Sequence, residues 1–225
     1  MNEFALAFAL FLGLHSVPAI PAIRSAIIRR TGRSAYFILY STVSTAVLIW
    51  VFRAALALDY IPLWDFQPWH AAITIFLAPI GIFLVIAGLL SCNPLSVSLR
   101  TSGQRGAIVL VTRHPVLWGF AFWAVGHLVA NGDLRALFLF GGFALFSLGS
   151  IPLAEKRARN RLGTSWTDVA ASTSVFPFAG LLRGHGLGID MPILFGAVAA
   201  AIITGWLLLG GHSFLFGADP IATLM

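Results

Sequence analysis

Residues 70–92 read HAAITIFLAPIGIFLVIAGLLSC, a run of 23 residues without an acidic, Lys or Arg side chain. About 20 apolar residues in a helix cross the hydrocarbon core of a bilayer, so this run predicts a transmembrane segment. A lone strand in lipid would leave its backbone N–H and C=O groups unpaired, so the segment is expected to be helical. The run therefore predicts a membrane protein built of helices.

The composition extends this prediction to the whole chain. Of the 225 residues, 59% are hydrophobic and 10% are charged, whereas a soluble domain carries about 25% charged residues. The mean hydropathy of +0.91 agrees. This balance argues against a soluble enzyme, a disordered chain and a nucleic-acid binder. Cys92 is the only cysteine, which excludes an internal disulfide and a Cys-rich metal site.

Five further apolar stretches complete a predicted all-α bundle of about six transmembrane helices. The predicted spans are Phe4–Ile23, Ala35–Leu58, His70–Cys92, Val116–Asn131, Leu134–Leu153 and Ile189–Gly211. The first basic residue is Arg24, so the apolar start lacks the basic segment of a signal peptide and is expected to stay as a span.

Twelve of the 14 Lys and Arg residues fall in alternate connections between these spans. They are Arg24, Arg29, Arg30, Arg33, Arg100, Arg105, Arg113, Lys156, Arg157, Arg159, Arg161 and Arg183. Because basic residues accumulate in cytoplasmic loops, this pattern predicts three cytoplasmic loops and two periplasmic termini. The net charge of +6 then reflects topology. We therefore expect the lipid bilayer, and no nucleic acid, as a partner.

Two of the basic connections look amphipathic. Residues 22–33 place Ile23 and Ile27 on one helical face and most arginines on another, and residues 156–166 are similar but more charged. Such a segment is expected either to lie as a helix on the membrane surface or to form a solvated loop.

Two of the six histidines fall inside predicted spans. His15 and His127 lie within apolar segments, whereas His70, His185 and His212 lie at span ends or in a loop. A polar side chain inside the membrane is costly unless it is paired, so an intramembrane histidine is a functional candidate. Two imidazoles from different helices, among aromatic residues, suit a haem iron better than zinc, which takes three or four ligands. The alternative is a hydrogen bond to a carbonyl or serine of a neighbouring helix.

Three segments resemble the NnrU family. They are FLGLHS at 11–16, LRTSGQRGAIVLVTRHP at 99–115 and TRHPVLWGFAFWAVGHLVANGD at 112–133. This family is related to the plastid 15-cis-zeta-carotene isomerase. The resemblance runs from about Glu3 to His185. It suggests a haem-binding membrane domain at 1–188 and an additional C-terminal transmembrane helix with a short tail at 189–225.

The resemblance implies haem b, with the early-helix histidine and the second histidine of the RHP segment as iron ligands. In this chain these are His15 and His127. It also implies a role in denitrification, in nitrite and nitric oxide metabolism, within the bacterial inner membrane and with redox partners of that process. It further implies redox-dependent, isomerase-like chemistry, although Ala124 stands where the isomerase has a cysteine, which argues against a sulfur-based ligand switch. Arg113 and His114 are expected either to neutralise haem propionates or to cap a span.

A second resemblance leads to another class of function. RHPVLWG at 113–119, EKRARNRLGTSW at 155–166 and FPF at 176–178 are similar to the C-terminal pattern of isoprenylcysteine-type membrane methyltransferases. That pattern implies an S-adenosylmethionine site and a lipid-phase substrate. Leu117 and Trp118 replace an expected tyrosine, and Ala154 precedes Glu155 where a Glu pair is expected. A haem-free assembly or transport factor, whose histidines only pair helices, is the third hypothesis.

Overall fold

The computed structural model describes residues 1–16, 20–100, 102–182, 186 and 188–224. The regular structure of these residues is helical and contains no strand, which confirms the all-α prediction. Arg183 and His185 lie outside the described residues. The chain divides into two compact units, one of residues 1–63 and 133–139 and the other of residues 64–132 and 140–225.

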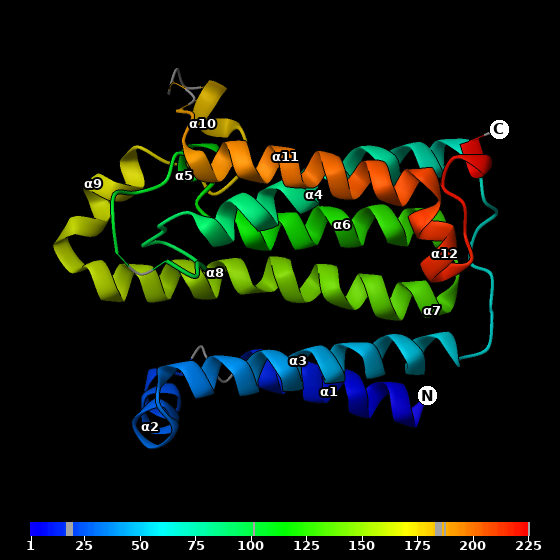
Figure 1. Ribbon diagram of the computed structural model, residues 1–225, viewed down its shortest axis with the longest axis horizontal. Coiled ribbons are helices and arrows are strands. Elements are labelled where there is room, and N and C mark those ends of the chain that lie inside the picture. The colour runs from blue at the N-terminus through cyan, green and yellow to red at the C-terminus, as the bar shows by residue number, and fades with distance from the viewer. Residues whose placement is uncertain (17–19, 101, 183–185, 187, 225) are drawn as a thin grey trace. The chain divides into compact units, whose positions relative to one another are not determined.

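In the first unit the helices α1 and α3 lie side by side (Figure 1). Its elements are α1 (Asn2–Ser16), α2 (Pro21–Thr31), α3 (Arg33–Leu56) and α7 (Leu134–Ala136). The Trp50 Nε1 atom of α3 donates to Glu3 Oε1 of α1 over 2.9 Å. Helix α2 occupies the basic connection at 22–33 and ends at Gly32, whose φ of 80° favours glycine.

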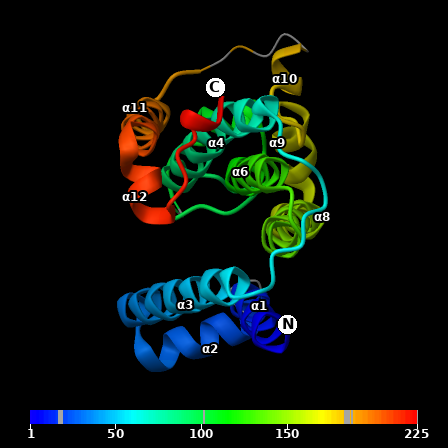
Figure 2. The same cartoon turned by 90° about the vertical axis from the view of Figure 1, so that its right-hand side faces the viewer.

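The second unit is a bundle around α4 and α6. Its elements are α4 (Pro68–Leu90), α5 (Ile108–Val111), α6 (Pro115–Asn131), α8 (Gly142–Leu162), η3 (Gly163–Ser165), α9 (Trp166–Ala171), α10 (Ala179–Leu182), α11 (Met191–Trp206), η4 (Leu207–Gly211), α12 (His212–Phe216) and η5 (Ala222–Leu224). The π-helical segment η2 (Leu137–Gly141) leads into α8. Helix α6 packs between α4 and α8, and α11 packs on α4 (Figure 2).

Glycines bring α4 and α6 into close contact. A Cβ atom placed on Gly81 would lie 2.6 Å from the carbonyl oxygen of Gly119, and a Cβ atom on Gly119 would lie 2.6 Å from that of Gly81. Further along, Thr74 Oγ1 donates to the Gly126 carbonyl over 2.6 Å. Small residues allow membrane helices to approach each other in this way, and polar hydroxyls add hydrogen bonds between them. The backbones of α4 and α6 therefore lie in close contact.

Four helices of the described chain are long and apolar enough to cross a membrane. They are Arg33–Leu56, Pro68–Leu90, Leu134–Ala171 and Met191–Phe216. Helix α1 has 15 residues and α6 has 17. At 1.5 Å per residue they are about 22 and 25 Å long, shorter than the roughly 30 Å core. Length and composition thus support a membrane protein with four of the six predicted spans.

Candidate functional site

His127 lies near the end of α6. The helix begins with Pro115 at its first position and ends before Gly132, which adopts the left-handed conformation. His127 lies four positions before Asn131, the last residue of α6. This spacing corresponds to about 6 Å along the helix axis. The Nδ1 atom of His127 lies 2.7 Å from the Trp123 carbonyl oxygen. Donation from Nδ1–H leaves Nε2 with a lone pair, which is how metal-binding histidines are oriented.

Three rings surround the His127 imidazole at contact distance. The ring centroids of Trp123 and Phe140 lie 4.9 and 5.1 Å from that of His127. The His212 ring lies 6.4 Å away with an interplanar angle of 26°. His127 is thus placed in an aromatic environment that contains a second imidazole.

One π-helical segment and one helix kink build this environment. Phe140 belongs to η2, and His212 is the first residue after η4. Within η4, Gly210 has a φ of 116° and breaks the helix between α11 and α12. Short π-helical segments inside helices are frequently found at functional sites. The sequence placed His212 at a span end and did not predict its position beside His127.

His15 lies in the first unit and is engaged on both ring nitrogens. Its Nδ1 atom is 2.9 Å from the Phe11 carbonyl oxygen of α1, and its Nε2 atom is 3.2 Å from the Ser44 hydroxyl of α3. These are the contacts of the alternative interpretation, a histidine bonded to a carbonyl and to a serine of a neighbouring helix. For His15 to bind iron through Nε2, the contact with Ser44 would have to break.

Arg113 and His114 form a separate cluster with Glu155, in which His114 is buried and the other two side chains are partly buried. Arg113 Nη1 donates to Glu155 Oε2, and His114 Nε2 donates to Oε1, each over 2.8 Å. Ser96 Oγ lies 2.9 Å from His114 Nδ1. Burial lowers the pKa of His114, and the bond to Glu155 opposes this only in part. The imidazole is therefore neutral, with Nε2–H donating to the carboxylate and Nδ1 accepting from the serine.

This cluster does not share a site with His127. His114 immediately precedes α6, and His127 lies within α6, 13 positions after His114. About 20 Å of helix therefore lies between the two histidines. Arg113 is further held by Thr173, which accepts from Nε over 2.8 Å. The structure therefore brings Arg113 and His114 to Glu155, and not to the imidazole pair.

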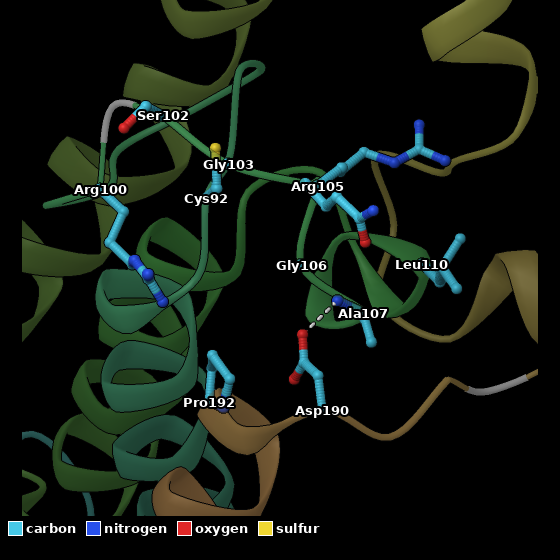
Figure 3. Close-up of a pocket in the computed structure, with 11 residues that line it drawn as sticks. Cys92, Arg100, Ser102, Gly103, Arg105, Gly106, Ala107, Leu110, Asp190 and Pro192 are labelled. Atoms are coloured by element: carbon cyan, nitrogen blue, oxygen red, sulfur yellow. Dashed lines mark hydrogen bonds between the residues drawn. The ribbon is translucent and has the colours of Figure 1, made fainter.

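A pocket of about 400 Å³ lies beside the connection between α4 and α5 (Figure 3). It is lined by Cys92, Arg100, Ser102, Gly103, Gln104, Arg105, Gly106, Ala107, Leu110, Asp190 and Pro192. Asp190 Oδ2 accepts from the Ala107 backbone over 2.8 Å. The Arg105 side chain extends away from Asp190 and donates to Ser172 over 3.0 Å. Two charged side chains of this pocket, Arg105 and Asp190, thus already bond within the chain.

Metal ions without a porphyrin have no evident site in the described part of the chain. Among these residues no group of three or more His, Cys, Asp and Glu side chains is placed to hold an ion. A haem iron needs only one or two protein ligands, because the porphyrin supplies the others.

The comparison with known families gives one match. The sequence model described as NnrU protein matches residues 3–220, nearly the whole chain. The match includes α11 and α12 and so extends beyond the segments quoted from the sequence. No curated protein and no solved structure matches the chain at a significant level.

Proposed function

Because the chain belongs to the NnrU protein family, we propose that it is an integral membrane protein that binds haem b, with His127 as an axial ligand of the iron. The observation that carries the proposal is the His127 imidazole, whose Nδ1 is bonded to the Trp123 carbonyl while Nε2 keeps its lone pair. Its neighbours Trp123 and Phe140 are aromatic, as expected beside a porphyrin. Haem bound there supplies redox chemistry and a site for diatomic gases.

The sequence motifs also suggest where the protein acts and in which metabolism. We place the chain in the bacterial inner membrane, in the nitrite and nitric oxide metabolism of denitrification, with a redox protein as its partner. His15 is the sequence-based candidate for the opposite axial position. We do not propose the isomerase reaction for this protein, because Ala124 replaces the cysteine that the isomerase carries before its second histidine.

The optical spectrum tests the haem proposal. Full-length protein, produced with ample haem and purified in detergent, is expected to show a Soret band and about one haem b per chain. His127→Ala is expected to lose the haem or to change its coordination, because the variant removes an axial ligand. The spectrum and the haem content of both proteins measure this.

His70→Gln is the matched control. His70 Nδ1 accepts from the Gln67 backbone at the start of α4, and Gln fulfils the same role in capping boxes. This variant is expected to keep the wild-type spectrum. A colourless wild-type protein, or an unchanged spectrum in His127→Ala, would refute the proposal.

Six spans with both termini periplasmic are part of the proposal, and reporter fusions test them. A reporter after Met225 is expected to behave as periplasmic and one inserted near Gly103 as cytoplasmic, because 12 basic residues fall on alternate connections. Alkaline phosphatase and fluorescent fusions measure the two sides. If both sites report the same side, the number of spans between them is even, where three were expected.

A further inference from the structure

His127 and His212 form the same kind of hydrogen bond, from Nδ1 to a backbone carbonyl oxygen. His212 Nδ1 lies 2.8 Å from the Ala218 carbonyl oxygen, as His127 Nδ1 lies 2.7 Å from that of Trp123. In both residues, donation from Nδ1–H leaves the lone pair on Nε2. The two rings lie 6.4 Å apart at their centroids and are within 26° of parallel. Two imidazoles with the same Nδ1 hydrogen bond to a backbone carbonyl are thus held next to each other.

The chain places His212 there by interrupting a helix. The helix kinks within Leu207–Gly211, where Leu209 and Gly210 depart from helical φ and ψ. The following helix α12 is five residues long and ends at Gly217, in the left-handed conformation, which turns the chain so that Ala218 meets His212. Phe216 packs on the His212 ring, with centroids 5.0 Å apart. The orientation of this imidazole is thus fixed from both sides.

The separation of the two rings fits a shared metal centre. Imidazole nitrogens bind metal ions at about 2 Å, so two of them on one ion lie about 4 Å apart and their ring centres lie further apart than that. The observed 6.4 Å between centroids is consistent with this arrangement. His15 is less suited, since its Nε2 contacts Ser44 within the first unit.

We propose that His212 is the second axial ligand of the haem iron held by His127. The inference rests on the proposed function, since it assumes haem at His127. It assigns to the C-terminal helix α12 a part in the site, and it gives the iron two ligands from a single unit of the chain. If both histidines held the iron, no coordination position would be free for a gas molecule, so haem at this site would be suited to electron transfer.

Electron paramagnetic resonance of the ferric full-length protein in detergent tests the inference. The wild type is expected to be low-spin and six-coordinate. His212→Ala is expected to keep haem on His127 and to become high-spin, and added free imidazole is expected to restore the low-spin signal. His15→Ala is expected to stay low-spin. A role of His212 in stability alone would lower the melting temperature and leave the spin state unchanged.

Two other outcomes would contradict either the assignment of His212 alone or the haem proposal as well. A low-spin His212→Ala protein together with a high-spin His15→Ala protein would assign the second position to His15 and overturn the inference, while the proposed function would stand. A wild type without haem would overturn both.

A second variant covers the case in which His212→Ala does not fold. His212→Met keeps a side chain that can bind iron, and His/Met coordination raises the reduction potential of haem. The midpoint potential of this variant is therefore expected to rise above that of the wild type. An unchanged potential and spectrum would show that residue 212 does not touch the iron.

Discussion

Replacing Gly119 with alanine is expected to destabilise the protein by roughly 2–3 kcal/mol, as overpacking does, although Gly→Ala inside a helix ordinarily stabilises by about 1 kcal/mol. The new Cβ atom would lie 2.6 Å from the Gly81 carbonyl oxygen and 2.9 Å from the Val85 nitrogen. Both are backbone atoms of α4, and a backbone cannot rotate out of the way as a side chain can. Helix α6 must therefore move away from α4. Thermal unfolding in detergent, followed by near-ultraviolet circular dichroism, measures the loss.

Gly149→Ala in α8 is the matched control. A Cβ atom at Gly149 meets nothing within 4 Å, so this substitution is expected to leave the melting temperature unchanged or slightly higher. The two variants differ in the surroundings of the added methyl group and not in helix propensity. If Gly119→Ala melts at or above the wild-type temperature, the α4–α6 contact is not as close as described.

The helices could be predicted from hydropathy because apolar runs end at turn signals. The predicted span Ala35–Leu58 corresponds to α3 (Arg33–Leu56), and His70–Cys92 corresponds to α4 (Pro68–Leu90). The predicted span Leu134–Leu153 differs more, because α8 continues to Leu162. The residues after 153 are mostly Glu, Lys and Arg, which are charged, together with Ala, and all four favour helix. Hydropathy therefore ends a span there while the helix continues.

The pairing of helices and the neighbours of His127 could not be predicted. Nothing in the sequence identified Gly81 and Thr74 of α4 as the partners of Gly119 and Gly126 on α6. The position of His212 depends on the kink at Leu209 and Gly210. The apolar run continues through this kink, so hydropathy alone does not mark it.

The candidate residues themselves were recognisable because burial of a polar side chain in an apolar helix is unusual. This reasoning selected both His15 and His127. It could not separate an iron ligand from a histidine that joins two helices, because that distinction depends on the partner of Nε2. Only the structure shows Ser44 beside Nε2 of His15.

Replacing Glu155 with alanine is expected to cost about 3 kcal/mol, the lower end of the range for breaking a buried ion pair. The side chains of Arg113 and Glu155 are 13% and 19% exposed, and His114 is fully buried. Without the carboxylate, the Arg113 guanidinium loses its counter-charge and the His114 Nε2–H loses its acceptor. A loss of this size is a large share of a typical stability of about 5–15 kcal/mol. Denaturation in detergent measures it.

Two further variants isolate the ion pair. Glu3→Gln is the matched control, because Glu3 is exposed and its Trp50 partner can still donate to an amide oxygen; its effect is expected to stay within about 0.5 kcal/mol. The double variant Glu155→Ala, Arg113→Ala is expected to lose less than the sum of the single losses, since the second change removes the unpaired charge.

A more conservative variant, Glu155→Gln, separates the two functional hypotheses. About 20 Å of helix lies between His114 and His127, so a folded Glu155→Gln protein is expected to keep the wild-type haem spectrum at reduced stability. A methyltransferase would behave differently, because its carboxylate holds S-adenosylmethionine. Wild-type stability combined with lost S-adenosylmethionine binding in Glu155→Gln would favour methyl transfer. Since both oxygens of Glu155 already bond to Arg113 and His114, we expect the cluster to act on stability, by fixing the start of α6 against α8.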